Sequence, residues 1–319
     1  LGLRKPSTCF PIGSLNIGIS NPFKEVGNPA TAWTSSDITL SIVSKRIFIL
    51  MVFVMAGQDS MTGLFGAINA ADAIPIVFYG TDYHSHLGTC YGGIAYVDRN
   101  GDTLKSIHDI GNSQFKSKFR DEMRDIRSRI AVGVISDKDP QPLTFVSRFG
   151  PFAICMNGFI ENSAELERRK IKEGTIFAEV YHGEVNQTDL IANIINEGDT
   201  IEAGIRKMWG VIKGSASLLI LTPDGIIAAR DLNGVSPLVI GSDGKGWAVA
   251  SESGFYANLG YRTVDFLEPG EIVMIDMDGP RTISKGGSKK KICSFLWIYT
   301  GFPSSEYEGI NTEMVRENC

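Results

Sequence analysis

The order of elements along the chain predicts an α+β protein in which sheets and helices pack in layers. Three segments with helical spacing follow one another between residues 163 and 212, and strand-like segments lie before and after them. After Gly214 the apolar pattern changes from helical spacing to short aliphatic runs typical of strands. Helices grouped in this way favour layered sheets over an alternating, parallel α/β fold.

Residues 61–150 are expected to alternate between buried strands and amphipathic helices. Apolar residues recurring every three or four positions indicate a helix, and short apolar runs beside turn residues indicate a strand. The expected elements are a strand at 64–68, a helix from 74 to about 83, a strand at 92–97 with its hairpin turn at 98–102, one amphipathic helix over Phe115, Phe119, Met123, Ile126 and Ile130, and a strand at 131–135.

Residues 151–319 are expected to contain the remaining helices and then the second group of strands. Asn162 is in position to cap the helix that follows it. The expected elements are a strand at 152–155 leading into Met156-Asn157-Gly158, helices at 163–171, 188–197 and 201–212, and strands at 218–221, 226–229, 237–240, 247–250 and 271–275. The stretch 284–292, with its glycines and lysines, is interpreted as a linker. Cys293 to Tyr299 is predicted to be the first strand of another unit, 293–319.

Composition indicates a soluble globular protein. The 319 residues are 43% hydrophobic and 21% charged, and the net charge of -5 disfavours a nucleic-acid binder. The apolar run Ile47–Ala56 is too short to span a bilayer. The five cysteines, at positions 9, 90, 155, 293 and 319, follow neither a metal-ligand spacing nor a disulfide framework. These features predict a cytoplasmic protein that contacts neither nucleic acid nor membrane, with no metal site.

Thr62, in the stretch Met61-Thr62-Gly63-Leu64-Phe65-Gly66, is the candidate nucleophile. If Met61 is the native start and is removed, the free amine of Thr62 lies beside its hydroxyl and can accept its proton during attack. Residues 1–60 are then a non-native or disordered extension, with Met55 as the alternative start. An ordinary turn at the start of a strand is the competing interpretation of this stretch.

The motifs from residue 61 to about 280 resemble, in the same order, those of the class II glutamine amidotransferases, which are N-terminal-nucleophile hydrolases. The matching stretches are Gly63–Gly66, His86-Leu87-Gly88 with Gly93-Ile94, Asn157-Gly158, Arg230-Asp231 with Gly234 and Pro237-Leu238, Ala250–Ser253 and Glu268–Val273. Within that class the chain is most similar to the amidophosphoribosyltransferases. Residues 293–319 resemble the entry into their phosphoribosyltransferase domain.

The resemblance implies a four-layer αββα fold that cuts ammonia from glutamine. It assigns Thr62 to the nucleophile position and Asn157 and Gly158 to the oxyanion hole, and it places His86 and Gly88 in a substrate-binding loop. An isolated Asn-Gly pair is otherwise a tight turn. Arg230-Asp231 is expected to form a structural turn.

Several positions depart from the family pattern. The family has cysteine where this chain has Thr62, and arginine where it has Leu87. In the family an arginine holds the glutamine carboxylate, and this chain has Ser136 at that position. An aspartate of the family holds the α-ammonium group, and this chain has Gln187 there. A serine cannot reproduce the bidentate guanidinium contact. These changes predict a retained fold with impaired glutamine chemistry.

The resemblance also bears on cofactors and partners. It implies Mg²⁺ for the transferase domain, glutamine or ammonia and phosphoribosyl pyrophosphate as substrates of the intact protein, and a homo-oligomer. Some relatives bind an iron–sulfur cluster with a cysteine near position 293, although a structural cysteine is the simpler interpretation of Cys293. Two other functions stay open, namely a silent regulatory or scaffold domain and a threonine hydrolase that cleaves another amide.

Overall fold

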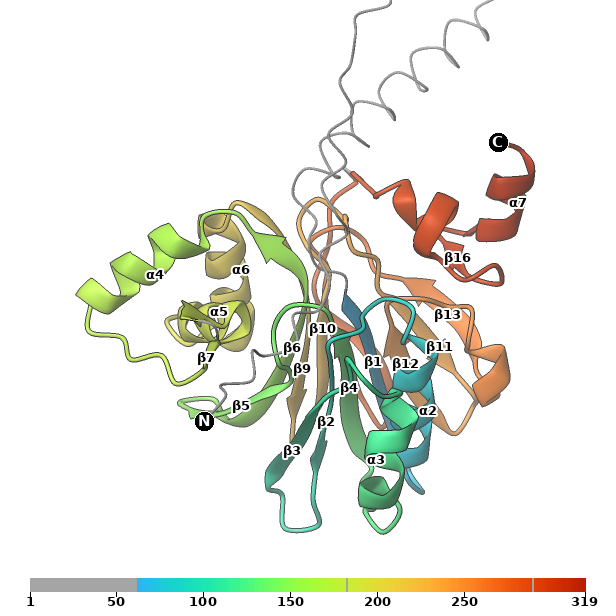
Figure 1. Cartoon of the computed structure of the whole chain (residues 1–319), viewed down its shortest axis with the longest axis horizontal. Coiled ribbons are helices and arrows are strands. Elements are labelled where there is room, and N and C mark those ends of the chain that lie inside the picture. Colours follow the sequence, from blue (N-terminus) through green and yellow to red (C-terminus); the bar gives the residue numbers. More distant parts are fainter. Residues whose placement is uncertain (1–61, 182, 289) are drawn as a thin grey trace, which may run out of the picture. The chain divides into compact units, whose positions relative to one another are not determined.

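The computed structural model describes residues 62–181, 183–288 and 290–319, all within the compact unit Gly57–Cys319. The prediction of a non-native or disordered extension over residues 1–60, and that of a start at Met61, lie outside the described residues. Figure 1 shows the unit as two sheets with helices on both sides. The model thus confirms the α+β class predicted from the order of elements.

The strands form two large antiparallel sheets in the part of the chain that is described. The larger sheet has the order β13-β11-β12-β1-β4-β2-β3, with strands β1 (Thr62–Asn69), β2 (Tyr91–Val97), β3 (Thr103–Asp109), β4 (Ile130–Ser136), β11 (Val239–Ser242), β12 (Gly246–Ala250) and β13 (Arg262–Phe266). The second sheet has the order β15-β14-β10-β9-β6-β5, with strands β5 (Leu143–Ser147), β6 (Gly150–Ile160), β9 (Gly214–Thr222), β10 (Gly225–Ala229), β14 (Ile272–Asp276) and β15 (Gly279–Ser284). Two small hairpins pair β7 (Val180–Tyr181) with β8 (Glu184–Val185) and β16 (Glu306–Tyr307) with β17 (Ile310–Asn311).

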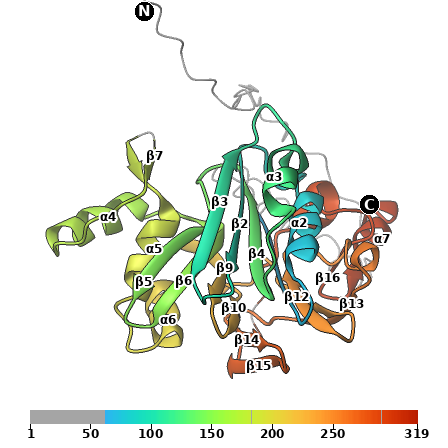
Figure 2. The ribbon, with the colours of Figure 1, turned by 90° about the horizontal axis from the view of Figure 1, so that it is seen from below.

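The helices are α2 (Ile74–Tyr83), α3 (Phe115–Met123), α4 (Ser163–Lys172), α5 (Gln187–Ile195), α6 (Ile201–Val211) and α7 (Thr312–Glu317), with a 3₁₀ turn at Ala257–Leu259 and a π-helical turn at Leu296–Thr300. Helices α2 to α6 pack against the outer faces of the two sheets (Figure 2), whereas α7 packs on the π-helical turn and β17 of the C-terminal segment. Buried residues of α2 and α3 share one apolar cluster with the larger sheet. Those of α4, α5 and α6 share another with the second sheet.

A third apolar cluster joins the two sheets to each other. Leu64 and Val134 of the larger sheet belong to it together with Leu219 and Val273 of the second sheet, and all four are buried. Strands whose two faces are both covered lose the alternation of polar and apolar residues. This explains why β1 and β9 are nearly continuous apolar runs in the sequence.

Three sequence predictions about individual elements were wrong. The helix over 115–130 ends at Met123, and Ile130 instead begins β4. Asn162 stands at the start of α4 but its side chain does not cap that helix, because it bonds to the backbone of Val211 and Lys213. Cys293–Tyr299 is not a strand, since a π-helical turn occupies Leu296–Thr300.

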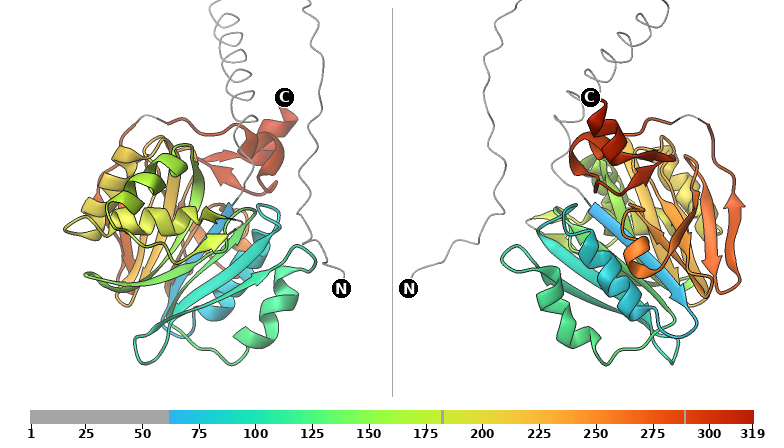
Figure 3. Two further views of the ribbon diagram at one scale, coloured as in Figure 1. Left: turned by 60° about the vertical axis from the view of Figure 1, so that its left-hand side comes forward. Right: turned by 90° about the vertical axis from the view of Figure 1, so that its right-hand side faces the viewer.

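The C-terminal residues pack firmly on the rest of the unit. Tyr307 and Ser305 are buried and both donate to the Glu252 carboxylate, at 2.7 and 3.2 Å. In the stretch interpreted as a linker, Gly287 N donates to Pro269 O and Lys291 N donates to Asn233 O. Figure 3 shows the C-terminal segment after residue 290, in red, beside the end of β1 that begins with Thr62. It therefore helps to build the surroundings of the candidate nucleophile.

Candidate functional site

A small cavity of about 70 Å³ is lined by two of the three residues expected to carry the chemistry, and the third, Gly158, is not among its lining residues. Thr62 and Asn157, from different sheets, both line it. The other lining residues are Leu87, Val235, Ser236, Pro237, Ser251, Glu252, Cys293, Phe295, Leu296 and Thr300. The fold thus brings the predicted nucleophile position and the predicted oxyanion-hole amide to one small cavity.

Thr62 is held at the first position of β1. It is 6% exposed and pairs in register with Ser136 of β4. The next residue, Gly63, packs so closely on His84 that a β-carbon there would lie 2.7 Å from the His84 Cβ. The Ser251 hydroxyl accepts from the backbone N–H of Leu64 at 3.0 Å. These contacts fix the backbone that presents the Thr62 hydroxyl to the cavity.

Asn157 and Gly158 lie inside β6 and do not form a turn. They pair with Ser217 and Ala216 of β9, so the tight-turn interpretation of the pair is wrong. Gly158 has φ of 150°, and a β-carbon there would lie 2.0 Å from Ser215 O. Only glycine fits this position. The Asn157 amide lines the cavity and makes no hydrogen bond with the other described residues, so it is available to a substrate oxygen.

The two positions of the altered glutamine clamp are both buried and engaged with backbone. Ser136 Oγ accepts from Lys138 N at 3.3 Å. Gln187 Oε1 accepts from Ile160 N at 3.3 Å. Neither lines the 70 Å³ cavity, and neither carries a charge that would hold an amino acid.

Asp139 is a buried acidic residue near this clamp that the sequence interpretation missed. Its Oδ2 accepts from Gln187 N at 3.2 Å, at the start of α5. Burial raises the pKa of the Asp139 carboxyl, and the nearby Lys138 partly opposes that rise. The Asp139 carboxylate thus already accepts a hydrogen bond from the first turn of α5.

His86 and Gly88, the predicted loop residues, occupy different surroundings. His86 Nε2 is 3.1 Å from Glu252 Oε1, and Glu252 lines the Thr62 cavity. Gly88 lines a separate polar cleft, and a β-carbon there would lie 2.8 Å from Ile135. His86 therefore touches the wall of the site, whereas Gly88 is required for packing on β4.

Glu252 is the most buried charge in the wall of the cavity, at 1% exposure. Burial opposes ionisation of this carboxyl. The hydrogen bond and the charge of His86, the charge of His84 and the hydroxyl of Tyr307 outweigh that effect and hold the pKa of Glu252 below its usual value. The neighbouring His84 is fully buried, and burial lowers its pKa. A fixed negative charge thus lies beside the cavity, held by groups from two other segments, the loop with His84 and His86 and the C-terminal residues.

Leu87 and Cys293 also line the cavity, although neither was predicted to belong to the glutamine site. The replacement of the family arginine by Leu87 within the His-x-Gly motif was the available sequence signal. For Cys293 the relevant signal was misread as a strand. Burial raises the pKa of the Cys293 thiol, which disfavours the thiolate.

The described residues do not fit an iron–sulfur cluster. Such clusters are usually held by four thiolates. No group of three or more His, Cys, Asp or Glu side chains suited to a metal is found among residues 62–181, 183–288 and 290–319. Cys293 is buried near Phe295 and Leu296, whose backbone groups contact its sulfur, and Cys155 is enclosed in β6.

Comparison with known proteins agrees with this geometry. Residues 127–256 match a family described as a glutamine amidotransferase domain. The amidophosphoribosyltransferase of Bacillus subtilis is 27% identical over 280 residues, which cover 84% of this chain and 57% of that protein. The amidophosphoribosyltransferase of Methanocaldococcus jannaschii is 29% identical over 289 residues, covering 81% of this chain and 59% of that protein. The predicted resemblance to the glutamine amidotransferases is confirmed.

Solved structures support the same assignment. The glutamine phosphoribosylpyrophosphate amidotransferase of B. subtilis, in complex with ADP and GMP, superposes with a TM-score of 0.72 at 27% identity. That superposition covers 80% of this chain and 56% of the other. The mixed fold with antiparallel sheets is thus similar to the amidotransferase domain of that enzyme. The chain spans a little over half the length of the curated relatives it matches.

No helix among the described residues is long and apolar enough to cross a membrane.

Proposed function

We propose that this chain is the glutaminase half of an amidophosphoribosyltransferase-like protein whose glutamine site is impaired. The observation that carries the proposal is the cavity that joins Thr62 to Asn157 while the clamp positions Ser136 and Gln187 carry no charge. The intact protein would transfer ammonia to phosphoribosyl pyrophosphate, as the names of the relatives suggest, in the purine pathway. Mg²⁺ would serve the transferase reaction.

The chemistry available to Thr62 depends on its becoming the first residue. In that state its own amine would act as the base while the Asn157 amide and the backbone N–H of Gly158 receive the developing oxyanion. A hydroxyl is a poorer nucleophile than a thiol, because a cysteine is already partly ionised near neutrality and an alcohol is not. The arrangement of the cavity residues therefore suits the reaction, but the hydroxyl nucleophile would make the reaction slow.

The three apolar clusters support a finer description of the fold. We propose that α2 and α3, the two sheets, and α4 to α6 form the four layers of the N-terminal-nucleophile hydrolases. Residues 293–319 would then be the start of the phosphoribosyltransferase domain, and the protein would be a cytoplasmic homo-oligomer that contacts neither nucleic acid nor membrane.

A silent scaffold domain is the second candidate function. The uncharged clamp favours it, since a scaffold requires the fold but not the glutamine contacts. A threonine hydrolase that acts on another amide would need the free Thr62 amine.

Two measurements test the proposal. Intact mass and N-terminal sequencing of the protein from its own host should give a chain that begins at Thr62; a mature chain that begins upstream would exclude Thr62 as an N-terminal nucleophile. Ammonia release from glutamine by that protein should be very slow. Ammonia release from other amides would favour the hydrolase instead.

A further inference from the structure

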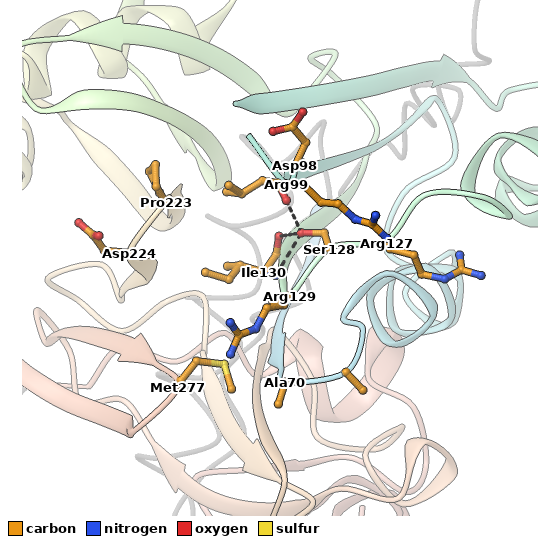
Figure 4. A pocket seen from close by; sticks show the side chains of 12 residues that line it. Ala70, Asp98, Arg99, Arg127, Ser128, Arg129, Ile130, Pro223, Asp224 and Met277 are labelled. Carbon is orange, nitrogen blue, oxygen red and sulfur yellow. Dashed lines mark hydrogen bonds between the residues drawn. The ribbon is translucent and has the colours of Figure 1, made fainter. Parts of the chain in front are cut away.

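The Thr62 cavity is small, and one segment supplies the largest share of its wall. Its volume of about 70 Å³ is several times below the range of about 300–1,000 Å³ typical of small-molecule sites. The π-helical turn and the residues just before it supply four of the twelve lining residues, namely Cys293, Phe295, Leu296 and Thr300. By contrast, the cleft at the other end of β1, shown in Figure 4, has a volume of about 470 Å³.

This segment, residues 293–302, lies between two points at which the chain is attached to the unit. Before it, Lys291 N donates to Asn233 O at 2.7 Å. After it, the hydroxyls of Ser305 and Tyr307 donate to the Glu252 carboxylate, which itself belongs to the cavity wall. The segment is thus held against the cavity on both sides.

Arg316 of α7 holds the π-helical turn in shape. Its Nε donates to Trp297 O at 2.8 Å, and its Nη2 donates to Gly301 O at 2.7 Å. The Trp297 indole N–H donates to Ile310 O at 3.1 Å. Turns of this kind are rare and occur frequently at functional sites. The turn therefore keeps its form through polar contacts with residues that do not line the cavity.

Polar contacts, and not the apolar core, attach this segment to the unit. In the part of the chain that the structure describes, no residue after Ile283 belongs to any of the three apolar clusters. Tyr299 and Phe302 are 62% and 44% exposed. Segments with few buried apolar contacts open at a low cost in free energy, without unfolding of the core. The segment can therefore detach while both sheets stay folded.

We propose that residues 293–302 form a lid that narrows the Thr62 cavity, and that an amide substrate reaches Thr62 when this lid detaches from Glu252. The narrowed cavity is lined by Thr62 and Asn157 but by neither position of the altered clamp, so it takes in the reacting end of a substrate and not the amino-acid end. The inference rests on the proposed function, because it concerns access to the same site. Its test measures labelling of residue 62 instead of ammonia release, so either proposal can fail without the other.

The rate at which N-ethylmaleimide labels a cysteine at position 62 of the full chain tests this inference. Peptide mass mapping identifies the labelled position, because the chain has five cysteines of its own. The reference is Met277→Cys, which places a thiol in the cleft of Figure 4, where Met277 is 36% exposed. Thr62→Cys should react at least about tenfold more slowly than Met277→Cys.

Two changes to the lid should each speed the labelling of Thr62→Cys at least about tenfold. Arg316→Gln removes both bonds to the π-helical turn, and Leu296→Ala removes a side chain from the cavity wall without requiring detachment. Glu317→Gln, at the exposed neighbour of Arg316, is the matched control and should leave the rate unchanged. None of the three changes should alter the labelling of Met277→Cys, and circular dichroism should show that all variants are folded.

Faster labelling of Thr62→Cys in either lid variant, with the labelling of Met277→Cys unchanged, supports the lid. The inference is overturned if Thr62→Cys in the otherwise native chain reacts as fast as Met277→Cys. It is also overturned if neither Arg316→Gln nor Leu296→Ala speeds the labelling, or if Glu317→Gln speeds it as much as Arg316→Gln does.

Discussion

The His86 imidazole and the Glu252 carboxylate, 166 residues apart in the sequence, lie 3.1 Å apart at the wall of the Thr62 cavity. The same carboxylate receives the hydroxyls of Tyr307 and Ser305. One buried charge thus joins the loop after α2, the Ala-Ser-Glu-Ser motif and the C-terminal segment. The Glu252 carboxylate therefore ties that segment to the wall of the site.

Replacing Glu252 with glutamine should loosen the C-terminal segment. The amide loses the charge and one acceptor oxygen, so the donors His86, Tyr307 and Ser305 lose charge-assisted bonds. We expect a loss of about 1.5–3 kcal/mol in the free energy of unfolding. Urea denaturation measures it, and hydrogen exchange should increase over residues 302–312. Glu306→Gln, at an exposed neighbouring carboxylate, is the control and should change neither value.

The contribution of Glu252 should disappear in acid. Its folded pKa is held below its usual value, so the ionised group adds stability above the unfolded pKa of about 4.3. That contribution is lost as the pH falls through the folded pKa. The stability difference between the native protein and Glu252→Gln should therefore be full near pH 6 and should shrink below about pH 4.3. A difference that grows toward acid pH would show that the sign is wrong.

Gly158→Ala should destabilise the protein strongly. The new methyl group would meet Ser215 O at 2.0 Å, in a backbone region that is unfavourable for alanine. We expect a cost above about 3 kcal/mol, because a clash adds to the strain. Gly174→Ala is a matched control, since Gly174 also has positive φ but its added methyl would meet nothing within 4 Å. It should cost only about 1 kcal/mol. Equal losses would show that the contact with Ser215 is unimportant.

Arg230→Met should also weaken the attachment of the C-terminal segment, because it removes the ion pair between Arg230 and Glu308. Arg230 is fully buried and donates to Leu267 O at 2.5 Å, to Glu308 Oε1 at 2.6 Å and to Gly234 O at 2.8 Å. Removing one member of a buried ion pair costs about 3–5 kcal/mol. Lys290, 2.5 Å from Glu308 Oε2, should keep the loss near the lower value. Thermal unfolding compares it with Arg281→Met, an exposed position on β15 that should be nearly neutral.

Much of the fold could be predicted from local pattern, because strands such as β1 and helices such as α5 have strong apolar periodicity. The apolar pattern misled where helical spacing continued past the end of a helix. Ile126 and Ile130 keep helical spacing after Met123, but Ile130 is needed in β4, where it pairs with Ile68 of β1. The aromatic residues of 293–299 resembled a strand, yet Phe295 and Tyr299 stack on each other across a helical turn at 4.5 Å.

The candidate site was predictable only through its motifs. Thr62 and Asn157 could be named from the sequence, and the arginine position at Leu87 was visible there. Their meeting in one cavity depends on the packing of the two sheets, which no local pattern contains. The partners of Glu252 were out of reach for the same reason, since they come from segments that are about 50 and 166 residues away.

The most direct test of the impaired glutamine site is ammonia release from glutamine by protein that begins at Thr62. It should be compared with Thr62→Cys and with a variant that also carries Ser136→Arg and Gln187→Asp. Two lost charge-assisted contacts at about 1.5–3 kcal/mol each correspond to a factor of roughly 10² to 10⁴ in kcat/KM, before the weaker nucleophile is counted. We predict negligible release by the unmodified protein, little gain from Thr62→Cys alone and clear activity in the triple variant. Robust turnover of glutamine by the unmodified protein would contradict the account.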